Sequence, residues 1–373
     1  MPTAIDAYYL QAIGVALAII FAFSRNRKMD LFPLVAVIAW LAGVCAIYYQ
    51  YGDNQVNFYS NDQDVHLRII QRYIQNEGVN LQGIIPLRYI ITYPTFLLSK
   101  IGLDEILVLK TIQILSLIGI YFKSKLVLSL QGLSFRLWHF AFIASPLMFF
   151  FSLLALRDLV LAFFTLSFIF QSKFQRRAIF ILLIFLLKPH LAIALLFGTV
   201  ALLLFNLIKT KVQLFSAFIL VIFSFVVGSI SYSIGAFFKD RFFPGLPNEI
   251  LSQAKISQLS LNFSGLQFFT LINDKNSIVA TPTHLLLLAR IVLFDTFLIP
   301  LSFGFISVFL LRYLRRESFM IFMSFVFYLG LVSQTDFNST RQNIPFLAAM
   351  GIVSVVNIEA ALRSRRKGML SQS

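Results

Sequence analysis

The stretch LLALRDLVLAFF, residues 153–164, places an arginine and an aspartate inside an otherwise apolar run that extends from Ala144 to Ser172. A charge at the centre of a bilayer costs about 2.5–3.5 kcal/mol on insertion scales, and less near the interface or in a wet cavity. The apolar runs 158–172 and 178–188 are too short for a full crossing. Arg157 and Asp158 are therefore expected at the outer end of a short helix, recessed below the membrane surface; the alternative is a pair that only snorkels there.

The composition supports a membrane-embedded chain. Hydrophobic residues make up 58% of the sequence and charged residues 13%, and the mean hydropathy is +0.83; these values exclude a water-soluble globule. Apolar runs of spanning length recur along the chain. They lie at 7–23, 31–49, 104–122, 137–153, 158–172, 178–188, 191–208, 214–235, 285–311, 318–333 and 343–360. The sequence thus predicts an all-α, polytopic integral membrane protein with about eleven transmembrane helices, some of them short or re-entrant on the outer side.

The basic residues set the expected orientation. The net charge is +15, but the basic residues are spread over many interhelical segments and form no single stripe of the kind that binds nucleic acid. Short cytoplasmic loops carry the lysine and arginine excess. The segments assigned to the cytoplasm are 25–28, 123–136, 173–177, 209–211, 312–316 and 363–367. This assignment predicts an outer N-terminus and a cytoplasmic C-terminus, and it leaves most of the acidic residues on the outer side.

The chain is expected to form one transmembrane domain, residues 1–373, with two large outer segments. The segment 50–103 contains a predicted amphipathic helix and an interfacial stretch at 84–100, where Pro86, Arg88 and Pro94 disfavour a lipid-facing helix. The second segment, 236–284, is a long polar loop. Its amides, hydroxyls and aromatic rings suit a neutral polar ligand, but an amphipathic loop resting on lipid explains them equally well.

The first outer segment carries the candidate general base. Asn61 or Asp62 is expected to cap a helix whose apolar face contains Val65, Ile69, Ile70, Tyr73 and Ile74, with His66, Arg68, Arg72 and Gln75 pointing elsewhere. The helix dipole favours ionised carboxylates in the first turn, and an ionised carboxylate can accept a hydroxyl proton. Asp62 or Asp64 is therefore a candidate base, and the alternative role of either is simple capping.

A second grouping lies in FLLKPHLAIALL, residues 185–196, where Lys188, a helix-breaking proline and His190 are consecutive between two apolar halves. Several basic residues lie on the outer side or within the membrane, so the cytoplasmic excess of lysine and arginine does not account for them. They are Arg68, Arg72, Arg88, Arg157, Lys188, Arg290 and Arg341. Arginine can bind phosphate oxygens through two hydrogen bonds, and lysine binds them as a point charge. A site that binds a lipid-linked pyrophosphate at the outer leaflet requires a lining of such basic side chains.

The run SPLMFFFSLLALRDLVLAFF (145–164), the short helix opened by KPHLAIALL (188–196) and the late TRQNIPFLAAMG (340–351) resemble the pattern of bacterial polysaccharide polymerases of the Wzy and EpsG type. In that pattern Arg-Glu or Lys-Glu follows a Ser-Pro helix end, Arg-Pro or Lys-Pro opens another helix, and an arginine precedes the last span. This chain departs from it with Arg157–Asp158 where glutamate is commoner, and with His190 where an aromatic residue is usual.

The resemblance implies transfer of an undecaprenyl-pyrophosphate-linked saccharide onto a second lipid-linked sugar at the outer face of the bacterial inner membrane. The alternatives are a GT-C-type glycosyltransferase with a polyprenyl-phosphate sugar donor and a transporter or flippase of lipid-linked glycans. The candidate catalytic residues are Asp62, Asp64, Arg157 and Asp158, and the candidate substrate-binding residues are Arg68, Arg72, Arg88, Lys188, His190, Arg290 and Arg341.

No cofactor or metal site is expected, since no ligand cluster indicates one. The expected partners are the polyprenyl-linked donor and acceptor, membrane lipid and other polysaccharide-assembly proteins, and nucleic acid is not among them.

Overall fold

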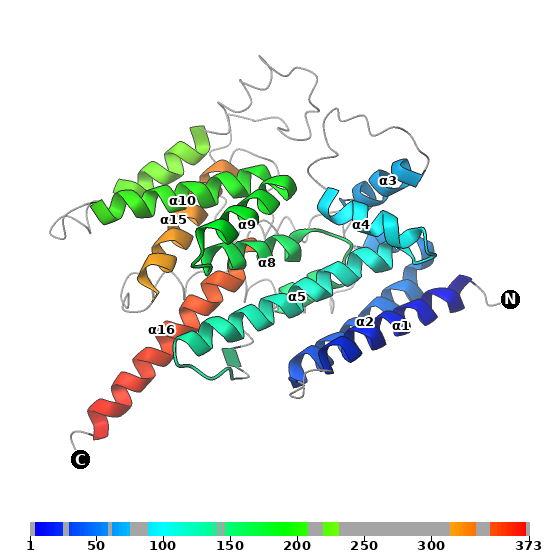
Figure 1. The fold of residues 1–373 in the computed structure, drawn as a ribbon, viewed down its shortest axis with the longest axis horizontal. Helices are drawn as coiled ribbons and strands as arrows, with labels where there is room; N and C mark the ends of the chain where they lie inside the picture. The colour runs from blue at the N-terminus through cyan, green and yellow to red at the C-terminus, as the bar shows by residue number, and fades with distance from the viewer. Residues whose placement is uncertain are drawn as a thin grey trace, which may run out of the picture.

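The computed structural model describes residues 4–24, 30–58, 62–74, 89–136, 138–139, 143, 146–207, 219–230, 314–332 and 344–370. Every element in this part of the chain is a helix, arranged as in Figure 1. The elements are α1 (Ala4–Ser24), α2 (Leu31–Tyr51), the 3-10 helix η1 (Gly52–Phe58), α3 (Asp62–Ile74), α4 (Tyr89–Ser99), α5 (Glu105–Leu130), α7 (Pro146–Ser152), α8 (Asp158–Ile169), α9 (Phe174–Leu187), α10 (Pro189–Leu207), α15 (Arg315–Val332) and α16 (Ile344–Leu370). One further helix covers Ile219–Ile230.

Five of the described helices are long and apolar enough to cross a membrane. They cover Ala7–Ser24, Leu31–Gln55, Glu105–Leu130, Pro189–Leu207 and Ile344–Arg363. Large apolar side chains remain exposed on helices at the periphery of the assembly, such as Phe21 of α1 and Leu203 of α10. Lipid is the environment in which such surfaces are stable. The prediction of an α-helical membrane protein is confirmed; the described residues contain five helices of spanning length, and the expected number of about eleven is not confirmed.

Two expected spans differ from the observed helices. The span predicted at 104–122 continues as α5 to Leu130, so part of the expected cytoplasmic segment 123–136 is helical. The described part of the predicted span 137–153 contains the seven-residue helix α7, and the chain leaves helical geometry after Ser152. The predicted span 285–311 and the loop 236–284 lie outside the described residues.

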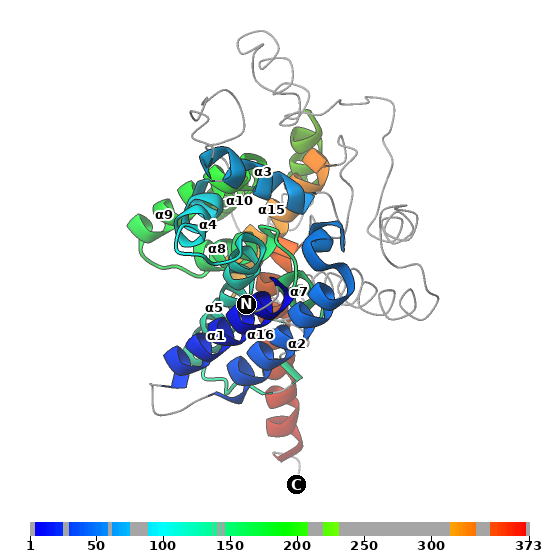
Figure 2. The same cartoon turned by 90° about the vertical axis from the view of Figure 1, so that its right-hand side faces the viewer.

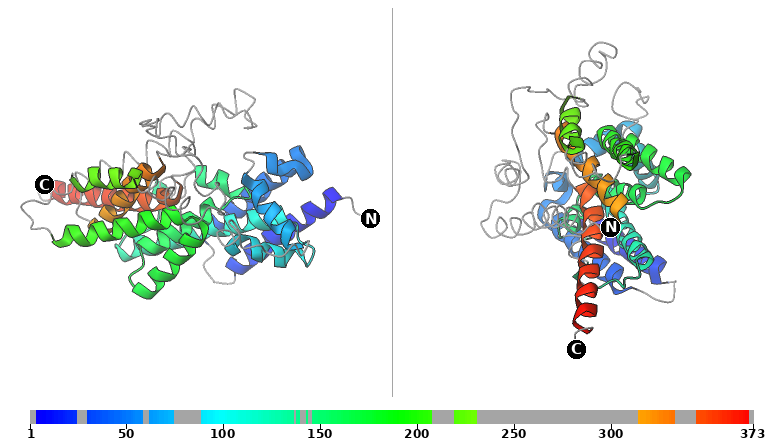
Figure 3. Two further views of the ribbon diagram at one scale, coloured as in Figure 1. Left: turned by 90° about the horizontal axis from the view of Figure 1, so that it is seen from above. Right: turned by 90° about the vertical axis from the view of Figure 1, so that its left-hand side faces the viewer.

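The long helix α5 defines two ends of the helical assembly. At its N-terminal end, Gln11 of α1 donates to the carbonyl of Gly102 over 2.9 Å and accepts from the backbone N–H of Asp104 over 2.8 Å. At its C-terminal end, Lys125 forms an ion pair with Asp30, the residue before α2, at 2.7 Å. The pair α1 and α2 therefore runs alongside α5, and the chain termini lie at opposite ends of the molecule (Figures 1 and 3).

Basic side chains gather at the C-terminal end of α5, which we call the basic end. Lys123 and Lys125 lie there on α5, and Arg176 of α9 is close enough to Lys123 to interact with it electrostatically. Arg363 of α16 donates to the carbonyl of Gly132 over 3.1 Å. The same helix places Glu359 3.2 Å from the buried His139. These contacts fix the end of α16 against the segment that follows α5.

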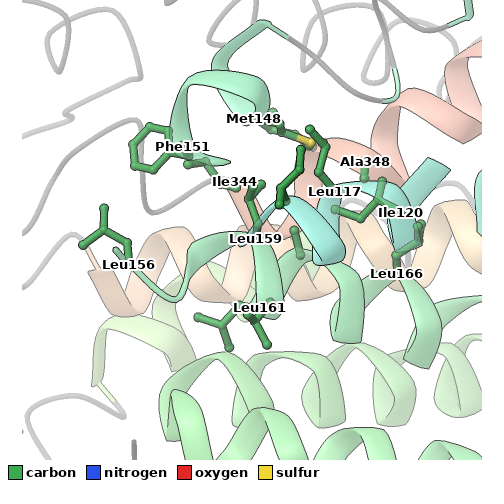
Figure 4. Packing of buried hydrophobic residues seen from close by; sticks show 14 of the residues in the cluster. Leu117, Ile120, Met148, Phe151, Leu156, Leu159, Leu161, Leu166, Ile344 and Ala348 are labelled. Carbon is green, nitrogen blue, oxygen red and sulfur yellow. The ribbon is translucent and has the colours of Figure 1, made fainter. Parts of the chain in front are cut away.

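The centre of the apolar core is α8, which packs against α5, α9 and α16. Figure 4 shows Leu117 of α5, Leu159 and Leu166 of α8, and Ile344 and Ala348 of α16 within this core. At about 1.5 Å per residue the twelve residues of α8 extend roughly 18 Å, which is short of the ~30 Å hydrocarbon thickness. Both ends of α8 therefore need partners for their backbone groups within the protein.

Among the described helices, α10 and α15 share the most extensive contact. Gly198 permits it, because a side chain there would collide with the Ser324 hydroxyl and would approach the Met320 carbonyl to 2.6 Å. The close approach places Tyr328 of α15 beside the start of α10, where its ring lies 5.9 Å from that of His190.

The described part of the first outer segment forms η1, α3 and α4. The helix α3 packs against η1 and α4, and α4 packs against α5 and lies beside α9 (Figure 2). Leu67, Ile69, Ile70 and Tyr73 of α3 are buried, as an apolar face requires. The prediction for His66 was wrong: the residue was assigned to the polar face, yet its side chain is 2% exposed. The reason is that α3 packs against α4, α5 and η1, so its inner face contains more residues than a helix resting on lipid would bury.

Candidate functional site

The first element of the candidate site is the break between α7 and α8, residues 153–157. Its backbone is held by side chains from three other elements. Trp40 of α2 donates to the carbonyl of Ser152 over 3.1 Å, and Gln63 of α3 accepts from the N–H of Ala155 over 2.8 Å. Gln113 of α5 contacts both sides of the break. These bonds satisfy backbone groups that would otherwise be unpaired in an apolar interior.

Gln113 uses both ends of its amide. Its nitrogen donates to the carbonyl of Leu156, and its oxygen accepts from the N–H of Leu159 over 3.2 Å. Gln113 is fully buried. A single side chain on α5 therefore fixes the backbone immediately before and after Arg157 and Asp158.

The second element is the break between α9 and α10. Lys188 has an extended backbone that ends α9, and α10 starts at Pro189, where proline suits the first helical turn because it lacks an N–H. The guanidinium of Arg157 donates to the carbonyl of Leu187 over 2.5 Å. Arg157 thus caps the C-terminus of α9, a position at which the helix dipole favours a cation.

The two breaks bring Arg157, Lys188 and His190 together, with Lys188 buried and Arg157 and His190 partly buried. Asp158 and Lys188 are 3% and 4% exposed, and both Arg157 and Lys188 are close enough to His190 to interact with it electrostatically. The Lys188 ammonium lies 5.4 Å from the centre of the Tyr328 ring, within the range of a cation–π contact. We call Arg157, Asp158, Lys188, His190 and Tyr328 the break cluster.

The break cluster lies inside the helical assembly. Gln113, which contacts the break, is eight residues beyond Glu105 at the start of α5, which corresponds to roughly 12 Å along the helix. The basic end lies farther away along the same helix. The cluster is therefore recessed below the end of the molecule at which α3 and η1 lie.

The candidate bases lie on α3, whose Gln63 contacts the first break. Asp64 forms an ion pair with Arg68 at 2.9 Å, and both side chains are partly exposed, at 44% and 62% respectively. Asp62 and Arg72 belong to the same helix, but their side chains are outside the described structure. Arg88, Arg290 and Arg341 also lie outside the described residues.

Sequence reasoning missed several polar residues of the site. Gln63, Gln113 and Tyr328 contact the break cluster or its backbone. A second missed group lies nearer the end of the molecule: the ammonium of Lys110, 1% exposed, donates to Gln55 over 2.7 Å. The same Gln55 oxygen accepts from the hydroxyl of Tyr8 over 3.1 Å. A lysine within the apolar run 104–122 was the available signal.

Fold and composition together define an α-helical, membrane-embedded protein with a buried charged site between broken helices. Comparison of the chain with known protein families, with curated proteins and with solved structures finds no match.

Proposed function

We propose that this protein is a membrane glycosyltransferase of the polysaccharide polymerase type. It joins polyprenyl-pyrophosphate-linked saccharide units at the outer face of the bacterial inner membrane. The observation that carries the proposal is the joining of two broken helices through Arg157 and Leu187, which gathers Arg157, Lys188 and His190 in one place. The resemblance of the stretches around these residues to Wzy-type and EpsG-type polymerases is a second support.

The chemistry of the break cluster suits a phosphate group. The helices α8 and α10 both begin at the breaks, and helix N-termini attract anions through their unpaired N–H groups and dipole. Arg157 and Lys188 add two positive charges. The apolar surfaces of the surrounding helices suit a polyprenyl chain. The free-energy cost of holding an anion at this depth is therefore lower for an anion attached to a lipid than for a soluble one.

In the proposed reaction, a hydroxyl oxygen of the acceptor sugar forms a bond to the anomeric carbon of the donor. The bond from that carbon to the pyrophosphate oxygen breaks, and the polyprenyl pyrophosphate departs with the electron pair. A carboxylate at the start of α3, Asp64 or Asp62, takes the hydroxyl proton. Arg157 and Lys188 stabilise the charge that develops on the departing oxygen. The reaction needs no further reactant.

The orientation belongs to the same proposal. Lys123, Lys125, Arg136, Arg176 and Arg363 lie on segments at the basic end, and an excess of lysine and arginine is typical of cytoplasmic loops. With the basic end in the cytoplasm, the break cluster, α3 and η1 lie toward the outer face.

The test is complementation of a strain that lacks the protein, with wild type, Arg157→Ala, Lys188→Met and Asp64→Asn at equal membrane abundance. We expect the two cation variants, and either Asp64→Asn or the corresponding Asp62→Asn, to accumulate single repeat units on the lipid carrier, with polymer formation reduced about 100-fold or more for the two cation variants. Lys125→Ala, which removes a charge at the basic end, is the matched control and should restore normal polymer. Normal polymer in all the site variants would refute the proposal.

A further inference from the structure

A pocket of about 540 Å³ lies between α1, η1, α3 and the turn that connects α4 to α5. Its polar lining side chains include Gln11, Asp53, Gln55, Gln71, Asp104 and Glu105. The pocket is at the N-terminal end of α5 and is distinct from the break cluster, none of whose residues lines it. Its volume is within the range of small-molecule sites.

The walls of the pocket are fixed by contacts behind them. Gln11 is bonded to both Gly102 and Asp104, and Asp104 accepts from the N–H of Leu107 over 2.8 Å as the N-cap of α5. Gln55 is held by Lys110 from behind. A pocket whose polar groups are already positioned loses less entropy when it binds a ligand.

The lining selects against anions. It contains the carboxylates of Asp53, Asp104 and Glu105, and among the described residues that line it none is an arginine or a lysine. Within the described part of the chain, no group of three or more acidic, histidine or cysteine side chains is placed to hold a metal ion. The lining instead combines carboxylate acceptors with glutamine amides, which both donate and accept. A neutral ligand with many hydroxyl groups matches this set.

One face of α3 connects the pocket to the break cluster. Gln63 contacts the first break, whereas Leu67 and Gln71, one and two turns farther along the same face, line the pocket. Eight residues of helix correspond to roughly 12 Å. A short oligosaccharide can cover this distance, so one end of a glycan in the pocket can lie near the break cluster.

We propose that this pocket is a saccharide subsite that binds the uncharged sugars of a lipid-linked glycan and disfavours acidic ones. The inference rests on the proposed function and deepens it by naming the substrate class. In this arrangement the cationic break cluster binds the phosphate groups, and the acidic pocket at the N-terminal end of α5 binds the sugars.

The test is direct binding to the full-length protein in lipid nanodiscs, measured by calorimetry. The probes are neutral tetrasaccharides built from glucose, galactose, mannose or N-acetylglucosamine, together with tri-galacturonate as the acidic probe. We expect at least one neutral probe to bind with a Kd on the order of 1 mM or tighter, and tri-galacturonate to bind at least about tenfold more weakly. The variant Gln71→Leu should weaken the neutral probe about tenfold, since it removes hydrogen-bonding groups from the pocket wall.

The matched control is Gln131→Leu, an equivalent change at an exposed position beyond the other end of α5. It should leave binding unchanged. A second variant, Asp53→Asn with Glu105→Gln, should remove the discrimination against tri-galacturonate. Spermidine, a cationic probe, is measured in the same way. Three results would each overturn the inference: equal affinity for neutral and acidic probes, no effect of Gln71→Leu, or binding of spermidine without binding of any neutral probe.

The binding assay is independent of polymer formation in cells. If the neutral probe binds as expected but deletion of the protein leaves the surface polymer intact, the proposed reaction fails and the saccharide pocket stands. If polymer formation depends on Arg157 and Lys188 but no neutral probe binds, the pocket inference alone fails.

Discussion

The guanidinium of Arg157 lies 2.5 Å from the carbonyl oxygen of Leu187 and so joins the start of α8 to the end of α9. The contact spans thirty residues of sequence and closes the break cluster on one side. It gives Arg157 a structural role whatever its role in chemistry. Stability and activity of Arg157 variants therefore have to be measured together.

Replacing Arg157 by alanine should lower the thermal stability of the purified protein. The variant leaves the Leu187 carbonyl without its charged donor, and a hydrogen bond to a charged group contributes about 1.5–3 kcal/mol. Arg157→Lys should recover part of this, because lysine retains the charge but lacks the planar donor group. Lys125→Ala is the control, since its exposed ion pair with Asp30 contributes only about 0–1 kcal/mol. Equal melting temperatures for Arg157→Ala and wild type would contradict the capping role.

Replacing Gln113 by leucine should loosen the break between α7 and α8. The change leaves the Leu156 carbonyl and the Leu159 N–H without their hydrogen bonds to Gln113, at a cost of about 1–3 kcal/mol for each buried group. We expect faster hydrogen exchange in residues 153–159, measured by mass spectrometry. Thr111→Val is the matched control, because the Thr111 hydroxyl bonds only within its own helix, to Leu107. Unchanged exchange in Gln113→Leu would show that other groups hold the break.

Replacing Gly198 by alanine should separate α10 from α15. The added methyl group collides with Ser324 and approaches the Met320 backbone carbonyl, and overpacking of this kind costs about 1–3 kcal/mol. The expected result is a lower melting temperature in detergent. Gly14→Ala makes the same change in α1, where nothing lies within 4 Å of the new methyl group, and should be neutral or slightly stabilising. A stable Gly198→Ala protein would mean that the two helices are not packed as closely as described.

Acidification should destabilise the basic end through His139. Burial lowers the pKa of His139 below its usual 6.5, and the nearby Glu359 only partly offsets this. Between the lowered pKa and about 6.5 the unfolded chain binds more protons than the folded protein, so stability falls as the pH decreases through this window. His139→Gln removes the titration, and its melting temperature should fall less than that of wild type between pH 7.5 and 5.5. An equal fall in both proteins would contradict the prediction.

The placement of His66 shows where sequence periodicity stops being informative. The sequence predicted a helix capped by Asn61 or Asp62, with an apolar face of Val65, Ile69, Ile70, Tyr73 and Ile74. The helix α3 begins at Asp62, and Ile69, Ile70 and Tyr73 are buried, whereas Ile74 is 49% exposed. The histidine was assigned to the polar face because it is a polar residue, whereas it is buried where α3 packs against α4, α5 and η1. The inner face also includes Gln63, which bonds to Ala155, ninety-two residues away in the chain. No local pattern contains that contact.

The sequence by itself determined the membrane-embedded helical class, the two helix breaks and the charges at them, because hydropathy, proline and ionisable residues act over a few neighbouring positions. The tertiary structure alone decided that both breaks meet at Arg157 and Leu187 and that Gln113 holds one of them. It alone placed Lys110 behind Gln55 and formed the pocket beside them. These features depend on contacts between helices far apart in the chain, and a buried polar group finds its partner only when those helices pack.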